Sequence, residues 1–138
     1  MILIAEDDLG DRVLLEQAFR ATSFEADLRF TANGEEFLAY LRREPPWEQA
    51  EPPDLILLDL NMPRKDGREV LAEIKQNPAL RSIPVVILTT SDSDRDVGRM
   101  YDLHANCFVT KPIDLEQFTK IVREIKSFWF SVVKLPPQ

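Results

Sequence analysis

The sequence of 138 residues contains one cysteine, Cys107, and one histidine, His104. A single cysteine excludes a framework of internal disulfides and indicates a reducing compartment. With so few thiol and imidazole groups, the chain also lacks the ligand set of an ordinary structural zinc site. Any metal bound by this protein is therefore expected to use oxygen ligands.

Basic clusters and long apolar runs are also scarce. The formal net charge is -7, and the basic pairs, Arg42-Arg43 and Arg64-Lys65, are short. Nucleic-acid binding needs a basic face, which this composition excludes. No apolar run approaches transmembrane length, and residues 1–5 pass directly into Glu6-Asp7-Asp8 without a signal-peptide pattern. We therefore expect a soluble, cytoplasmic protein with no nucleic-acid or membrane partner.

The sequence does contain enough apolar side chains for one hydrophobic core. Hydrophobic residues make up 44% of the chain and aromatic residues 9%. A length of 138 residues is usual for one domain. We expect a single domain over residues 1–138, with a core over about residues 1–127 and an apolar C-terminal extension over about residues 128–138.

Short apolar segments alternate with helical patterns along the chain. Four segments predict buried parallel strands because they are almost wholly apolar and too short for helices, namely residues 2–5, 55–58, 85–88 and 107–110. Residues 26–30 alternate in polarity, which predicts a more exposed strand near the sheet edge. Helical spacing predicts helices over about 9–22, near 37–43, before Asn77, over 94–104 and from Asp114 onward. This alternation predicts an α/β fold, a five-stranded doubly wound parallel sheet.

The four apolar strands each end at polar side chains. These are Glu6 and Asp7, then Asp59, then Thr89, then Lys111. Because the carboxyl ends of parallel strands meet at one edge of a sheet, we expect these side chains to converge. Three carboxylates packed together would raise one another's pKa values unless a cation joined them. An all-oxygen cluster of this kind favours Mg²⁺.

A carboxylate beside Mg²⁺ is a competent nucleophile toward phosphorus and would give an aspartyl phosphate. The Lys111 ammonium could neutralise phosphoryl oxygens, and the Thr89 hydroxyl could donate a hydrogen bond to one. Asp8 and Asp11 could tune the acidic pocket, with Asp8 expected to cap the first helix or to point outward. The strand ends therefore predict phosphoryl-transfer chemistry at Asp59.

The motifs ILIAEDD, LILLDLNMPRKDG, IPVVILTTS and CFVTKP occur in this order. With them, the chain resembles the receiver domains of two-component response regulators over almost its entire length. The resemblance implies a flavodoxin-like (βα)5 fold with strand order 2-1-3-4-5. It also implies that Asp59 accepts a phosphoryl group from a sensor histidine kinase. Such a protein is a switch with self-catalysed phosphorylation and slow autodephosphorylation, and is not an enzyme in the usual sense.

The resemblance also implies individual roles. The implied ligands of Mg²⁺ are Glu6, Asp7, Asp59 and the main-chain carbonyl of Asn61. Thr89 and Lys111 would contact the phosphoryl group, and Phe108 matches the switch aromatic of the family. The Lys111-Pro112 bond resembles a cis peptide bond of the family, which would aim the lysine at the site.

The segments KDGREVLAEIKQNP, LHANCFVTKP and KSFWFSVVKLP are similar to small response regulators that serve bacterial and cyanobacterial phytochrome kinases. This narrower resemblance implies a phytochrome-type kinase partner and a homodimer through the fourth helix, fifth strand and fifth helix. Phe128, Trp129 and Phe130 belong to a tail whose apolar residues wrap most of a helix circumference. One domain cannot bury all of them, so we expect a dimer interface there.

Other functions remain open at this point. A Mg-dependent phosphatase with an aspartyl-phosphate intermediate, of the haloacid-dehalogenase type, would carry an acid where this chain has Asn61. A flavodoxin-like cofactor binder would need a Ser, Thr or Gly-rich phosphate loop after the first strand, where Glu6-Asp7-Asp8 would repel phosphate instead. A degenerate scaffold that never takes phosphate is the third alternative.

Overall fold

The computed structural model describes residues 1–22, 27–60, 62, 67–89, 107–112 and 114–128. For Thr89 and Phe108 the description covers the backbone alone. The helix predicted over residues 94–104 lies outside the described residues. Within the described part of the chain, no helix combines the length and the apolar composition needed to cross a bilayer.

Five parallel strands form one sheet in the order β2-β1-β3-β4-β5, which confirms the expected fold. The strands are β1 (Ile2–Ala5), β2 (Leu28–Thr31), β3 (Leu55–Leu58), β4 (Val85–Thr89) and β5 (Cys107–Thr110). The helices are α1 (Leu9–Ala21), α2 (Gly34–Leu41), α3 (Gly67–Gln76) and α5 (Leu115–Ser127). Strand β2 spans Leu28–Thr31, slightly later in the chain than residues 26–30, which the polarity pattern indicates.

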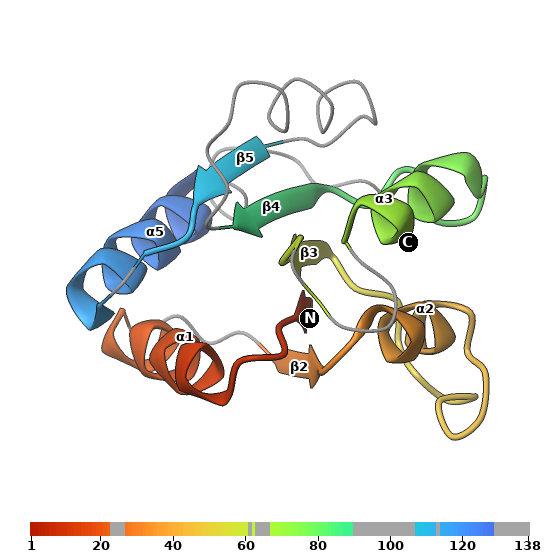
Figure 1. Cartoon of the computed structure of the whole chain (residues 1–138), viewed down its shortest axis with the longest axis horizontal. Coiled ribbons are helices and arrows are strands. Elements are labelled where there is room, and N and C mark those ends of the chain that lie inside the picture. Colours follow the sequence, from red (N-terminus) through yellow and green to blue (C-terminus); the bar gives the residue numbers. More distant parts are fainter. Residues whose placement is uncertain (23–26, 61, 63–66, 90–106, 113, 129–138) are drawn as a thin grey trace.

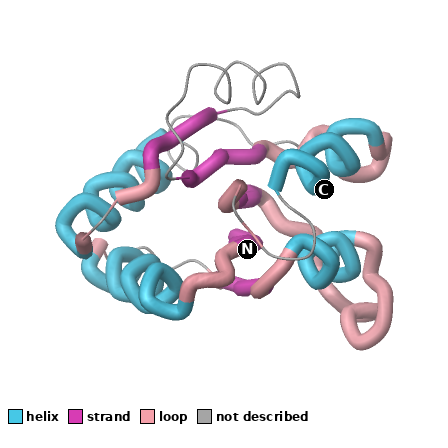
Figure 2. The backbone as a smooth tube through the Cα atoms, in the orientation of Figure 1, coloured by secondary structure: helices cyan, strands magenta, loops and turns pink. Residues whose placement is uncertain are grey.

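Helices cover both faces of the sheet, with α1 and α5 on one face and α2 and α3 on the other (Figure 1). The backbone trace shows the same three layers (Figure 2). Alternate strand residues enter two separate clusters of buried side chains. Leu3, Ile56 and Leu58 pack on the α2 and α3 side, while Ile4, Leu55 and Leu57 pack on the α1 and α5 side. The central strands are apolar throughout because both of their faces are buried.

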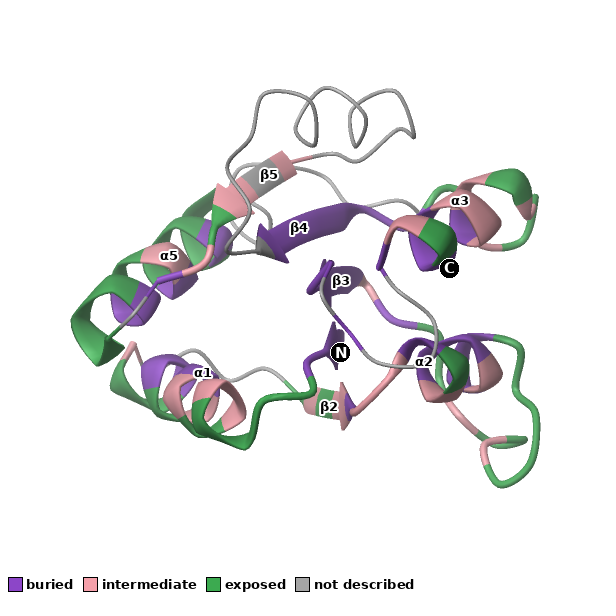
Figure 3. Cartoon of the chain, in the orientation of Figure 1, coloured by how far each residue is buried: buried purple, intermediate pink, exposed green. Residues whose placement is uncertain are grey.

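The central strands are buried, whereas the outer surfaces of the helices are exposed (Figure 3). Strands β1 and β3 are wholly buried, whereas β2 at the sheet edge has partly exposed and exposed positions. On β2, the aromatic ring of Phe30 is covered by Arg12 of α1, whose guanidinium carbon lies 4.9 Å from the ring centroid. The edge position of β2 explains why its sequence alternates in polarity.

Side-chain caps define where three of the helices begin. Asp8, Asn33 and Asp114 are the N-cap residues of α1, α2 and α5, and each accepts a hydrogen bond from a backbone N–H three residues later. For α1, the Oδ1 atom of Asp8 accepts from the N–H of Asp11 at 3.0 Å. The expectation that Asp8 caps the first helix is therefore confirmed.

The start of α3 lies directly against the chain that follows β3. The N–H of Gly67 donates to the carbonyl of Leu60 at 2.9 Å. A Cβ atom at position 67 would lie 2.6 Å from the carbonyl oxygen of Asp59 and 2.7 Å from the Cα of Leu60. Because these are backbone atoms, a larger residue would displace the segment that carries Asp59.

One expectation drawn from the family resemblance is not met. Among the described residues, the cis peptide bond is Pro45-Pro46, and Lys111-Pro112 is not cis. A cis bond is the minority state for a residue before proline, and the resemblance was the sole support for this expectation. The position of Lys111 therefore has to be explained by other contacts.

We predict that Gly67→Ala lowers the free energy of unfolding by about 1–3 kcal/mol, because the added methyl group overpacks a backbone contact. Alanine favours a helix over glycine, so the intrinsic propensity acts in the opposite direction. Urea unfolding would measure the change. Gly10→Ala is the matched control, since its nearest contact is a side-chain atom, Oδ1 of Asp8, at 3.1 Å. Equal stability of Gly67→Ala and the wild type would contradict the prediction.

Candidate functional site

Strands β1 and β3 bring two acidic residues together at the carboxyl edge of the sheet. Glu6 follows β1 and Asp59 follows β3, and the last residues of these strands, Ala5 and Leu58, are paired. The N–H of Asp59 donates to the carbonyl of Ala5 at 3.1 Å, which continues the strand pairing into the site. One carboxylate oxygen from each of Glu6, Asp7 and Asp59 lies within 4.8 Å of the others. The three carboxylates predicted to converge are therefore neighbours.

The three acidic residues differ in their exposure to solvent. Glu6 is 1% exposed and Asp59 is 5% exposed, whereas Asp7 is on the surface. Buried carboxylates are costly unless hydrogen bonds and opposite charges compensate them. Glu6 and Asp59 therefore need a cation at the inner side of the site, while Asp7 forms its solvent-facing edge.

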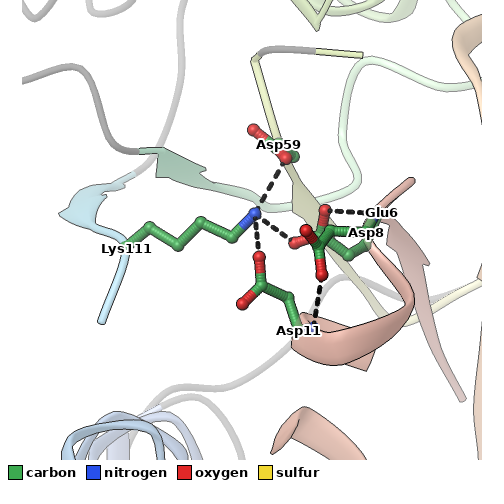
Figure 4. Close-up of polar contacts among 5 residues, drawn as sticks. All are labelled: Glu6, Asp8, Asp11, Asp59 and Lys111. Carbon is green, nitrogen blue, oxygen red and sulfur yellow. Dashed lines mark hydrogen bonds and ion pairs between the residues drawn. The ribbon is translucent and has the colours of Figure 1, made fainter. Parts of the chain in front are cut away.

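Lys111 supplies that positive charge. Its Nζ atom lies 2.5 Å from Oε1 of Glu6, 2.8 Å from Oδ2 of Asp11 and 3.1 Å from Oδ2 of Asp59. Figure 4 shows the lysine reaching these three carboxylates from the segment after β5. An ammonium group has three N–H donors, so each of these carboxylates can accept one hydrogen bond. The side chain of Lys111 is 8% exposed, and its charge is thus largely shielded from water.

Asp11 is the member of this cluster whose contact was not anticipated. The sequence indicates only that Asp11 could tune the pocket, and it suggests no partner for it. The available signal is the N-cap at Asp8, because the cap starts α1 immediately after the acidic residues and places Asp11 in its first turn. The rotation of that first turn decides whether Asp11 faces the site, and a sequence pattern does not specify it.

The pKa values of Glu6 and Lys111 reflect burial and charge together. Burial is the largest influence on Glu6 and raises its pKa to about 8; Lys111 acts in the opposite direction, and Asp59 adds to the rise. For Lys111, burial lowers the pKa, but hydrogen bonds to Asp11 and Glu6 and the charge of Asp59 outweigh it and raise the pKa. The ammonium of Lys111 therefore stays charged, and an added cation would favour the ionised form of Glu6.

The donor set of the acidic cluster fits a hard divalent cation. Its ligand atoms are all carboxylate oxygens, and the exposed Asp7 leaves one side accessible to water ligands. Mg²⁺ prefers oxygen ligands and usually keeps several waters, so these residues suit it. Asn61, whose carbonyl is the fourth ligand implied by the family resemblance, lies outside the described residues.

The remaining predicted residues are described in part. Thr89 ends β4 and pairs with Thr110, so its backbone lies at the same sheet edge as Lys111. Phe108 of β5 pairs with Ile87 of β4, and its side chain, like that of Thr89, lies outside the described part of the chain. Phe128 follows α5 as its C-cap and is 53% exposed. Trp129 and Phe130 lie outside the described residues.

Comparison with known proteins gives a consistent result. The family described as "Response regulator receiver domain" matches residues 2–123. Response regulator Rcp1 of Synechocystis sp. is 46% identical over 136 residues, which cover 99% of this chain and 92% of that protein.

Two solved structures resemble the whole chain. The phosphorylated cyanobacterial phytochrome response regulator RcpA has a TM-score of 0.93 at 46% identity, covering 99% of this chain and 97% of that chain. The Mn²⁺-bound form of Rcp1 has a TM-score of 0.91 at 46% identity, covering 99% and 98%. The strand-end carboxylates, the lysine after β5 and these matches lead to one conclusion: the chain belongs to the family of response regulator receiver domains.

Proposed function

We propose that this receiver accepts a phosphoryl group on Asp59 from a sensor histidine kinase and passes the signal on through protein contacts. The observation that carries the proposal is the position of Asp59. It is a buried carboxylate at the carboxyl end of a central strand, beside two further carboxylates and 3.1 Å from the Lys111 ammonium. A phosphorylated structure of the relative RcpA supports the same chemistry.

In the proposed transfer, an Oδ atom of Asp59 attacks the phosphorus of a phosphohistidine on the kinase. An oxygen–phosphorus bond forms, the nitrogen–phosphorus bond breaks, and the electron pair leaves with the imidazole, which takes up a proton. Lys111 would donate to a phosphoryl oxygen from its position beside Asp59. Thr89 would donate its hydroxyl to another oxygen, and Phe108 would change orientation as the switch residue.

We propose that Glu6, Asp7, Asp59 and the carbonyl of Asn61 hold Mg²⁺. When bound, Mg²⁺ would neutralise negative charge on the phosphoryl oxygens and on the carboxylates around them. The role of the protein residues is to hold these oxygens at one edge of the sheet. The Mn²⁺-bound structure of Rcp1 supports a divalent cation site in this family.

The kinase partner is proposed to be of the phytochrome type, since RcpA is a phytochrome response regulator with 46% identity to this chain over almost its full length. We place the protein in the cytoplasm and treat residues 1–138 as one receiver with an apolar extension from about residue 128. The protein would itself catalyse the transfer of the phosphoryl group from the kinase, and it would then lose this group by slow autodephosphorylation. No observation favours the Mg-dependent phosphatase that remained open as an alternative.

We also propose a homodimer through the fourth helix, β5, α5 and the extension. A hollow beside β5 and α5 has mostly apolar walls that include Cys107, Val109, Ile121, Ile125 and Phe128. The exposed ring of Phe128 lies where the extension begins. Trp129 and Phe130 follow Phe128 in the sequence, and we propose that a second copy covers the apolar surface to which they belong.

Incubation with acetyl phosphate and Mg²⁺ should add one phosphate to the wild type, and intact-mass spectrometry would detect it. Asp59→Asn should add none, because the nucleophilic oxygen is lost. Omission of Mg²⁺ should greatly reduce the adduct in the wild type. Asp27→Asn is the control, since Asp27 is an exposed residue whose carboxylate lies 3.5 Å from Arg29. An adduct of equal yield on Asp59→Asn would refute the assignment of the acceptor.

Asp7→Asn should weaken Mg²⁺ binding by about tenfold or more, because one charged oxygen ligand is replaced by a neutral one. Asp7 is exposed, so this change should leave the fold intact. Isothermal titration calorimetry would measure the affinity, with Asp27→Asn again as a variant of equal charge. Unchanged affinity in Asp7→Asn would remove Asp7 from the proposed ligand set.

Trp129→Ala should weaken self-association and leave phosphorylation intact, because it shortens an apolar side chain of the proposed interface and changes none of the proposed site residues. Sedimentation velocity at several concentrations would measure self-association, and mass spectrometry would measure the phosphate adduct. Leu9→Ala, which changes a residue of α1 that is 72% exposed, controls for general loss of surface apolarity. An unchanged sedimentation profile for Trp129→Ala would rule out this interface.

A further inference from the structure

We infer that Asp11 is a positioning residue for Lys111, which it holds beside Asp59 in readiness for the phosphoryl group. The inference rests on the proposed function, in which Asp59 is the acceptor. It assigns a role to an acidic residue outside the proposed metal ligands. The contact that carries it is the 2.8 Å ion pair between Oδ2 of Asp11 and Nζ of Lys111.

Asp11 differs from the other two partners of Lys111 in one respect. Glu6 and Asp59 also belong to the cluster of carboxylates suited to a divalent cation, and Asp11 does not. A cation on those oxygens would draw them away from the ammonium and would repel it. Of the three carboxylates that contact Lys111, Asp11 is then the partner that can keep the ammonium within reach of Asp59.

Asp11 stands on a well-fixed part of the chain. Its N–H donates to Oδ1 of Asp8 at 3.0 Å, and the N–H of Asp8 donates to Oε2 of Glu6 at 3.2 Å (Figure 4). Helix α1 is anchored by the buried side chains of Leu15 and Phe19. Lysine has a long side chain with many rotamers, so ordering it has an entropic cost. A rigid partner orders the side chain in advance, and phosphoryl binding then does not bear this cost.

The electrostatic effect of Asp11 agrees with its geometry. Oδ2 of Asp11 lies 2.8 Å from Nζ of Lys111, and only 8% of the lysine side chain is exposed. Water therefore competes little for this contact, and the attraction between the two charges is stronger than it would be at the surface. A charged and pre-oriented ammonium is what a developing phosphoryl contact needs.

Three roles for Asp11 can be distinguished by the sign of its effect on phosphoryl binding and by whether that effect depends on Lys111. A positioning residue acts through Lys111, so its removal should change phosphoryl binding in the same direction as removal of Lys111, by a smaller factor. A residue that competes with the phosphoryl group for Lys111 should have the opposite sign. A carboxylate that acts only through its negative charge should have the same effect whether Lys111 is present or absent.

The test is a double-mutant cycle on binding of beryllofluoride, a phosphoryl mimic, at saturating Mg²⁺, measured by isothermal titration calorimetry. Lys111→Met should weaken binding, and Asp11→Asn should weaken it by about 3- to 10-fold, because a hydrogen bond to a charged acceptor becomes one to a neutral acceptor. Asp11→Asn added to Lys111→Met should cause no further loss. Rates of phosphorylation by acetyl phosphate should follow the same pattern.

Two further variants keep the cycle interpretable. Glu16→Gln removes one negative charge from the same helix at a residue paired with Arg20, and should bind as the wild type does. Asp11→Glu keeps the charge and should retain binding within about threefold of the wild type. If thermal unfolding shows that Asp11→Asn does not fold, Asp11→Glu takes its place in the cycle.

Four outcomes would overturn the inference. Tighter binding in Asp11→Asn would make Asp11 a competitor, and an equal loss in the presence and absence of Lys111 would make it a general charge. Wild-type binding with no change in Asp11→Asn would overturn this inference and leave the proposed function standing. Failure of the wild type to bind beryllofluoride and to form a phosphate adduct would overturn both together.

Discussion

The balance of charge around the ammonium of Lys111 is the constraint on which the site depends. Two of its carboxylate partners, Glu6 and Asp59, are almost completely buried, and neither would be stable there without an opposite charge. The strands that carry them are adjacent and in register, so the carboxylates cannot separate without disturbing the sheet. The sheet fixes the positions of the two carboxylates, and the positive charge of the lysine stabilises them there.

Negative groups outnumber positive ones at the site. Glu6, Asp7, Asp11 and Asp59 supply four carboxylates, and Lys111 supplies one ammonium. A group of this composition would repel a phosphoryl group unless further positive charge were added. A divalent cation would supply that charge for the phosphoryl transfer proposed at this site. An ordinary structural ion pair would have no such need, because its charges would already be matched.

The fold could be predicted further from the sequence than the site could. Apolar strands that end on polar residues were sufficient to predict a parallel sheet, and parallel strands place Glu6 and Asp59 at one edge. The strand order came from the family resemblance and was confirmed. The contact of Asp11 was not predicted because it depends on the rotation of a helix, and the close approach of Gly67 was not predicted because it depends on the path of the chain after β3.

Lys111 also connects the proposed acceptor to the surface proposed for protein contacts. It follows β5, the edge strand that lines the apolar hollow with α5, and its ammonium reaches across the end of the sheet to Asp59, which follows β3, and to Asp11 on α1. In the proposed function, a phosphoryl group on Asp59 would change the acceptors available to that ammonium and so the forces on the end of β5. A change of this kind could shift the populations of two states of an edge strand, together with the proposed reorientation of Phe108. Lys111 is thus one physical link between the acidic site and the apolar surface.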